Sequence, residues 1–273
     1  MKIFLTGGTG FVGSHFISLA SKKHFIFALT RKKRTKRRNV KWLIGEMSDN
    51  WIKYLKKSDV FLHLAADGVN NKNITKKISL KNNVLLPMSL INQCLLANCK
   101  KWIIVGSASE YGPKNYNKKV LNTFLKPLPV SNYEISKNNF SELVLLISKI
   151  FVCKCRIMRL FYTYGSGEKK NRLWPSLIKS SDSGKNFFVK KPNLISNFID
   201  VKNAVKLILS SCNFKKNNNN FPQIWHIAGK KPIKIKDFVN TIWNERKAKG
   251  KLIFNKKRSN KFIFLSSLNS IWK

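Results

Sequence analysis

Short apolar runs alternate along the chain with longer segments in which apolar residues recur every three or four positions. The short runs predict strands, and the longer periodic segments predict helices. The predicted strands are residues 3–6, 25–30, 41–44, 60–64, 102–105, 153–160, 187–189 and 224–227. The predicted helices are residues 11–21, 51–55, 79–97, 132–147, 174–180, 203–211 and 235–246. Such alternation favours a parallel sheet with helices on both faces.

The same pattern suggests two parts. Strict alternation holds over residues 1–165, where we expect a Rossmann-type, doubly wound α/β domain that binds a dinucleotide. Residues 166–273 have a looser order, which predicts a small C-terminal lobe that binds substrate over the carboxyl edge of the sheet. We expect sheet and lobe to interleave in one compact unit. The asparagine run at 217–220 is expected to be a loop.

A glycine-rich turn follows the first predicted strand. Gly7, Gly10 and Gly13 recur at every third position, and G-x-G-x-x-G is also satisfied from Gly8 onward. Between a strand and a helix, such glycines permit a tight turn, close approach of a pyrophosphate and close packing of the helix. The helix N-terminus would supply N–H groups to the phosphates. The turn predicts a dinucleotide site, with a plain glycine turn as the alternative.

The end of the second strand bears on the choice of cofactor. An acidic residue there would bind the adenosine ribose of NAD. The sequence ALTRKKR (28–34) instead places Thr30 and Arg31 at this point. Because no carboxylate there repels a 2′-phosphate and Arg31 could pair with one, the sequence favours NADP(H), with NAD(H) as the alternative.

Three side chains suggest proton-transfer chemistry. Tyr133 and Lys137 are four residues apart in a predicted helix and therefore share a face. A nearby ammonium is expected to lower the pKa of the phenol, which suits proton exchange with a sugar hydroxyl or ketone. Ser107 follows the strand at 102–105, at the sheet edge where ligands bind, and could hydrogen-bond the oxygen whose proton Tyr133 handles. A surface ion pair between helix turns is the alternative for the tyrosine and lysine.

Motifs in a consistent order span nearly the whole chain, and together they resemble extended short-chain dehydrogenases/reductases of the NAD-dependent epimerase/dehydratase family. They are TGGTGFVG (6–13), HLAA (63–66), NNV (82–84), SASEYG (107–112), YEISK (133–137), RLFYTYG (159–165), NFIDV (197–201) and HIAGKKPIKIKDF (226–238).

The resemblance implies roles for individual residues. Ser107, Tyr133 and Lys137 would form the catalytic trio, with Lys137 also binding the nicotinamide ribose. Together with Arg31, the residues expected to bind the cofactor are Gly7, Gly10, Phe11, Val12, Gly13, Glu46, Leu64, Ala65, Ala66, Asn83, Tyr133 and Lys137. The residues expected to bind substrate are Ser107, Tyr162 and Arg172.

The family pattern is broken at several positions, and one of them bears on the substrate. The family commonly has an arginine and an aspartate where this chain has Ser196 and Asn197, and that arginine clamps the substrate diphosphate. Arg172 is our candidate to replace it.

Details within the family resemble nucleotide-sugar 4-ketoreductases: the ALTR strand end, the proline in NNVLLP (82–87) and the segment at 159–178. The implied reaction is hydride transfer at C4 of a nucleotide-linked sugar, for polysaccharide biosynthesis, with Tyr133 as the acid. One alternative is an NAD-dependent nucleotide-sugar 4-epimerase. Another is a non-catalytic protein that binds a dinucleotide or RNA. The resemblance also implies a homodimer formed through the helices at 79–97 and 132–147.

The charge of the chain is extreme. Its 53 lysines and arginines against 12 aspartates and glutamates give a formal net charge of +41. A basic surface attracts nucleic acid, but the lysines are spread over the whole chain and rise together with asparagine, which favours a coding bias at tolerant positions. Only KKRTKRR (32–38) is dense, and nucleic-acid binding is therefore disfavoured.

Neither the cysteines nor the apolar runs indicate export or a membrane. The five cysteines are interpreted as buried thiols, and no metal site is expected. No run reaches the roughly 18 apolar residues of a membrane helix, and the N-terminal segment is interpreted as a strand and not a signal peptide. We therefore expect a cytoplasmic protein.

Overall fold

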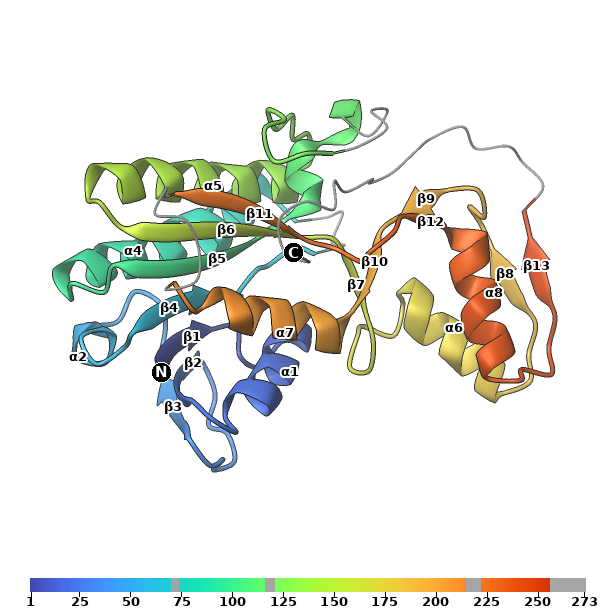
Figure 1. The fold of residues 1–273 in the computed structure, drawn as a ribbon, viewed down its shortest axis with the longest axis horizontal. Helices are drawn as coiled ribbons and strands as arrows, with labels where there is room; N and C mark the ends of the chain where they lie inside the picture. The colour runs from blue at the N-terminus through green and yellow to red at the C-terminus, as the bar shows by residue number, and fades with distance from the viewer. Residues whose placement is uncertain (70–73, 116–120, 215–221, 256–273) are drawn as a thin grey trace.

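A parallel sheet of seven strands forms the centre of the molecule, in the order β11-β6-β5-β4-β1-β2-β3 (Figure 1). The computed structural model describes residues 1–69, 74–115, 121–214 and 222–255, so the asparagine run at 217–220 lies outside the described residues. The strands are β1 (Lys2–Thr6), β2 (Phe25–Thr30), β3 (Val40–Ile44), β4 (Val60–His63), β5 (Lys101–Ser107), β6 (Lys154–Leu160) and β11 (Gln223–Ile227). All neighbouring pairs are parallel, which confirms the predicted doubly wound, Rossmann-type fold.

Helices cover both faces of this sheet (Figure 1). On one face lie α1 (Phe11–Ala20) and α7 (Val201–Ser211), and on the other lie α2 (Ile52–Leu55), α4 (Leu86–Leu96) and α5 (Asn132–Ile150). Alternate residues of each strand enter the two cores, since side chains of a strand point to opposite faces. Ile3 and Leu5 of β1 thus join the core under α1 and α7, whereas Phe4 joins the other.

The predicted helix at 79–97 is not one regular helix. It consists of α3 (Lys76–Leu80), a π-helical turn η1 (Lys81–Leu85) and α4. Pro87 lies in the first turn of α4 and has no N–H to donate to the carbonyl four residues earlier, which favours an irregular turn before it. Hydrophobic periodicity alone could not reveal this change.

The lobe lies beyond the carboxyl ends of the strands, at the right of Figure 1. It contains α6 (Leu173–Asp182), α8 (Ile235–Glu245), the parallel pair β8 (Phe187–Val189) and β13 (Leu252–Phe254), and the antiparallel pair β9 (Ile195–Ser196) and β12 (Ile233–Lys234). Its own core includes Leu177, Val189, Phe238 and Trp243. The parallel pair β7 (Tyr162–Tyr164) and β10 (Phe198–Asp200) connects it to the sheet, to which the chain returns through α7 and β11.

Two short 3₁₀ turns, η2 (Ala108–Tyr111) and η3 (Pro113–Asn115), follow β5. The five cysteines are free and buried. Within the described ranges, no helix combines the length and the apolar composition that a bilayer span requires.

Candidate functional site

The glycine turn after β1 is packed so closely that side chains are excluded from it. Gly7 has φ +73°, and a Cβ on it would lie 2.5 Å from the backbone nitrogen of Ala65. A Cβ on Gly13 would lie 2.0 Å from the Gly7 carbonyl oxygen. Gly10 precedes α1 in an extended conformation and makes no side-chain cap, so the first N–H groups of α1 stay open to an anion. This cradle fits a dinucleotide diphosphate.

The flanks of this turn contain further residues predicted to bind a cofactor. Phe11 and Val12 are half-buried in the first turn of α1. Leu64 and Ala65 follow β4 and lie against Gly7, whereas Ala66 is exposed. The turn and the end of β4 therefore meet, as the sequence predicts for one edge of a parallel sheet.

Asn83, which was also predicted to bind the cofactor, is buried and hydrogen-bonded within the protein. It is only 1% exposed. Its Oδ1 accepts a hydrogen bond from the Asp67 N–H at 2.8 Å, and its Nδ2 donates to Ser136 Oγ at 3.0 Å. Asn83 therefore ties the segment after β4 to α5, the helix that carries Tyr133.

Arg31 and Glu46 are both exposed, at the ends of β2 and β3. The Gly45 N–H donates to the Thr30 carbonyl at 2.9 Å and holds these two ends together. The Asp49 carboxylate accepts the Glu46 N–H at 2.9 Å. Asp49, which was not predicted from the sequence, reaches this edge through the turn after β3.

Ser107 and Tyr133 meet at the carboxyl edge. Ser107 ends β5 opposite Leu160 of β6, and its side chain caps η2. Tyr133 lies in the first turn of α5, which a Ser131–Glu134 capping box begins. Desolvation raises the pKa of Tyr133 to about 12, while a side-chain hydrogen bond with Ser107 and the charge of Arg172 act in the opposite direction.

Lys137 does not have the expected effect on Tyr133. Its Nζ is buried and donates to the Val105 carbonyl at 2.9 Å, and desolvation lowers the pKa of this ammonium. The expectation that Lys137 lowers the pKa of the phenol was wrong: that pKa is raised, and the cation that opposes the increase is Arg172. Spacing places two residues on one helix face, but it does not fix where a long side chain ends.

Two of the predicted substrate residues lie beside each other next to this site. The Arg172 guanidinium is 4.9 Å from the centre of the Tyr162 ring and forms an ion pair with Glu168. Burial raises the pKa of Tyr162, and Arg172 opposes the increase. The charge of Arg172 also acts on Tyr133, whose phenol is hydrogen-bonded to the side chain of Ser107. Ser196, where the family has an arginine, is buried in β9.

A buried carboxylate supports the site from behind. Glu110 is 0% exposed, and its Oε1 accepts the Ser107 N–H at 2.7 Å. Its Oε2 accepts from Arg159 Nε at 3.0 Å and from Ser141 Oγ at 3.2 Å. Glu110 thus fastens the end of β5 to both β6 and α5. Sequence reasoning missed this role, although the spacing of Ser107 and Glu110 matches a capping box.

Two buried histidines support the same edge through hydrogen bonds. His226 Nε2 lies 2.6 Å from the Tyr111 hydroxyl, and the Arg159 guanidinium is 4.4 Å from the centre of the Tyr111 ring. Desolvation, followed by the charge of Arg159, lowers the pKa of His226 to about 3. His63 lies behind the glycine turn, with Nδ1 2.8 Å from Thr6 Oγ1.

Known proteins share both the sequence pattern and the fold. A CDP-abequose synthase of Salmonella muenchen is 25% identical over 263 residues, which cover 92% of this chain and 83% of that protein. An uncharacterized UDP-glucose epimerase, YtcB of Bacillus subtilis (strain 168), is 29% identical over 199 residues, 66% of this chain and 62% of that protein. The chain therefore spans less than two thirds of the length of the Bacillus relative.

Solved structures show the same fold. A UDP-N-acetylglucosamine 4-epimerase from Methanobrevibacter ruminantium M1, in complex with UDP-N-acetylmuramic acid, superposes with a TM-score of 0.84 at 20% identity, over 99% of this chain and 89% of that one. MoeE5, in complex with UDP-glucuronic acid and NAD, superposes with a TM-score of 0.82 at 19% identity, over 98% and 90%. The sequence model of one family matches residues 3–228. On that match, the chain belongs to the NAD-dependent epimerase/dehydratase family.

Proposed function

We propose that the chain is an NADP(H)-dependent oxidoreductase that reduces the C4 ketone of a nucleotide-linked sugar. The observation that carries this proposal is the gathering of Ser107, Tyr133 and Arg172 at the sheet edge that also holds the glycine turn. A serine and a protonated phenol beside a dinucleotide cradle are the groups that carbonyl reduction requires from a protein.

The glycine cradle fits the cofactor, and Gly7, Gly10 and Gly13 would hold its diphosphate. Arg31, exposed after β2, would pair with a 2′-phosphate and favour NADP(H) over NAD(H). When bound, the reduced cofactor supplies the hydride. Lys137, fixed to the carbonyl of Val105, would bind the nicotinamide ribose. A fluorescence titration tests this half of the proposal, and the absence of NADPH and NADH binding would sink it.

Tyr133 would act as the proton donor. Because its pKa is raised to about 12, the phenol keeps its proton at neutral pH and can give it to the ketone oxygen as that oxygen gains negative charge. Ser107 would hydrogen-bond the same oxygen and hold it in place. Arg172 would bind the substrate beside Tyr162, and a planar guanidinium suits a diphosphate.

A 4-epimerase is the second candidate, and the names of the relatives favour it: YtcB and a Lactobacillus helveticus protein are both named as UDP-glucose epimerases. Epimerisation begins with oxidation, in which Tyr133 must accept a proton as phenolate. Net reduction requires only the reverse step, in which Tyr133 donates its proton. NADPH absorbance with CDP- and UDP-linked 4-keto sugars separates the two, because only reduction consumes cofactor. No turnover on any sugar would leave the non-catalytic alternative.

We also propose that two copies associate through α4 and α5. Leu143, Leu146 and Ile150 form a stripe on α5, 39%, 56% and 63% exposed, and Leu96 at the end of α4 is 62% exposed. Apolar side chains at this spacing on a helix suit a second helix pair. Light scattering should give twice the chain mass, and Leu146→Glu should give a monomer. The five free cysteines are in keeping with the cytoplasm, where we place the reaction.

A further inference from the structure

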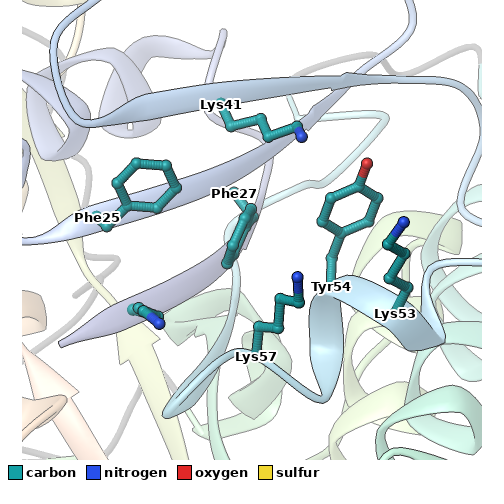
Figure 2. A pocket seen from close by; sticks show the side chains of 7 residues that line it. Phe25, Phe27, Lys41, Lys53, Tyr54 and Lys57 are labelled. Carbon is teal, nitrogen blue, oxygen red and sulfur yellow. The ribbon is translucent and has the colours of Figure 1, made fainter.

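A hollow of about 410 Å³ lies at the amino edge of the sheet, opposite the edge with the candidate site (Figure 2). Its walls are formed by the first residues of β1 and β2, by β3, by α2 and by Lys57, which follows α2. The residues that line it are Lys2, Phe25, Phe27, Lys41, Lys53, Tyr54 and Lys57. None of them belongs to the site described above.

The hollow exists because α2 is too short to cover this sheet face. Lys2 pairs with Phe25, and Phe27 pairs with Lys41, so the four side chains share one face. Further along the same face, Phe4 is buried under the helices. At the amino end only the four residues of α2 lie over the sheet, and Phe25 is left 37% exposed.

Aromatic rings form a continuous surface in this hollow. The centroids of Phe25 and Phe27 are 5.2 Å apart, and those of Phe27 and Tyr54 are 5.4 Å apart. Phe27 is buried, whereas Phe25 and Tyr54 have exposed surface. Such a surface can accept another flat ring by stacking.

Ammonium groups surround these rings. Lys41, Lys53 and Lys57 lie around Tyr54 (Figure 2), and Lys41 Nζ is 5.2 Å from the centre of that ring. Among the residues that the structure describes, the ion pairs with carboxylates are made by arginines and by none of the lining lysines. The neighbouring carboxylate of Asp59 accepts the backbone N–H of Lys2 at 2.7 Å. The hollow therefore keeps a net positive charge.

We propose that this hollow is a second nucleotide-binding site, which stacks a base on Phe25 and Tyr54 and holds an adjoining phosphate with Lys53 and Lys57. A ligand that is both flat and anionic uses the rings and the ammonium groups together, whereas an inorganic anion uses only the charges. Lys2 and Thr6 lie about 13 Å apart along β1 at about 3.3 Å per residue. The hollow is thus separate from the glycine turn that follows Thr6.

Net charge does not carry this proposal, because lysines cover the whole chain. The distinguishing feature of the hollow is that its ammonium groups lie beside a surface of aromatic rings. A test must therefore compare variants of equal charge and must examine stacking separately from charge.

The experiment measures fluorescence anisotropy of labelled oligoadenylate of about eight nucleotides on the full chain. Lys53→Gln/Lys57→Gln removes two charges from the hollow, and Lys190→Gln/Lys191→Gln removes two exposed charges from the lobe. Tyr54→Leu removes the ring and keeps the charge. NADPH binding, measured in parallel, should be unchanged in all three variants and shows that each is folded.

We expect the Lys53/Lys57 variant to bind about tenfold more weakly and to reduce the slope of log K against log salt by about 0.7, the value for the loss of one phosphate contact in a single strand. Tyr54→Leu should weaken binding about tenfold, as the loss of one stacked base does, without changing that slope. The Lys190/Lys191 variant should stay within about twofold.

Several results would overturn the proposal: no binding of the oligonucleotide, equal weakening by both lysine pairs, or an unaltered affinity in Tyr54→Leu. Displacement by NADPH together with unaltered affinity in the variants would place the oligonucleotide at the glycine turn, which also overturns it. Competition with AMP then shows whether the site binds a free nucleotide or a base within a strand. If AMP displaces the probe, a free nucleotide is sufficient; if only unlabelled oligoadenylate does, the site takes a base within a strand.

Discussion

The charged side chains at the two edges of the central sheet differ in whether they form ion pairs. At the carboxyl edge, two buried carboxylates are paired with arginines: Glu110 with Arg159, and Glu168 with Arg172. At the amino edge, lysines surround an open hollow and make no ion pair among the described residues. The chain has only 12 acidic residues, so the position of each carries information that the position of a lysine does not.

The comparison distinguishes charged residues that the fold requires from charged residues that the surface only tolerates. A buried ion holds its place only when a partner and hydrogen bonds compensate its desolvation, as they do for Glu110. An exposed lysine needs no partner, so lysines can accumulate without altering the fold. In so basic a chain, the few carboxylates and the arginines that pair with them therefore mark the edge of the proposed site more clearly than the lysines do.

The largest expected effect is the loss of the buried pair at the carboxyl edge. Glu110→Gln leaves the Arg159 guanidinium buried without its counter-charge, and the free energy of unfolding should fall by about 3–5 kcal/mol in urea titrations. Asp182→Asn is the matched control, because Asp182 pairs with Arg246 at the exposed surface of the lobe and should cost no more than about 1 kcal/mol. Equal losses in the two variants would remove the distinction between required and tolerated charge.

A smaller effect should appear on acidification. His226 has a folded-state pKa of about 3, below its unfolded value of about 6.5. The unfolded state therefore binds the proton first, and the stability that neutral His226 confers above pH 6.5 is lost as the pH falls towards 3. Between pH 7 and pH 5 the free energy of unfolding of the wild type should fall by about 2 kcal/mol more than that of His226→Gln, in which residue 226 does not titrate. Parallel stability curves for the two proteins would show that this histidine is not held neutral.

The smallest effect concerns cofactor choice. Arg31→Glu should weaken NADPH binding at least about tenfold, the equivalent of about 1.4 kcal/mol, because it removes the proposed partner of the 2′-phosphate and adds a charge that repels it. NADH affinity should be unaffected. Arg34→Glu makes the same change of charge three residues further along the exposed segment after β2. If it weakens NADPH binding equally, the effect is one of general charge and not of Arg31.

Local patterns made much of the fold predictable. The strands that enter the seven-stranded sheet and the glycine turn depend on neighbours along the chain, and the structure has them where the sequence predicts. The three-residue strand β8 was predicted, whereas the two-residue strands β9 and β12 were missed because their pairing depends on contacts between distant segments. The π-helical turn at Asn83 was missed because it depends on a proline and on hydrogen bonds to Asp67 and Ser136.

The site was predictable to a similar degree. Ser107 and Tyr133 come together because the carboxyl ends of parallel strands and the start of the next helix share an edge. The direction of the pKa shift of Tyr133 was not predictable, since it depends on burial and on the position of the Lys137 ammonium. The role of Glu110 depends on Arg159, 49 residues further along the chain, and no local pattern connects them.

The turnover number of Tyr133→Phe, compared with the wild type, tests the central claim most directly. Phenylalanine keeps the ring and removes the proton at the point where Ser107 and Arg172 act. With NADPH and an accepted nucleotide-linked 4-keto sugar, kcat should fall by about 10²–10⁴-fold while the variant still binds NADPH. A variant that consumes NADPH at the wild-type rate would contradict the account, because the gathered side chains would then not be the site of the chemistry.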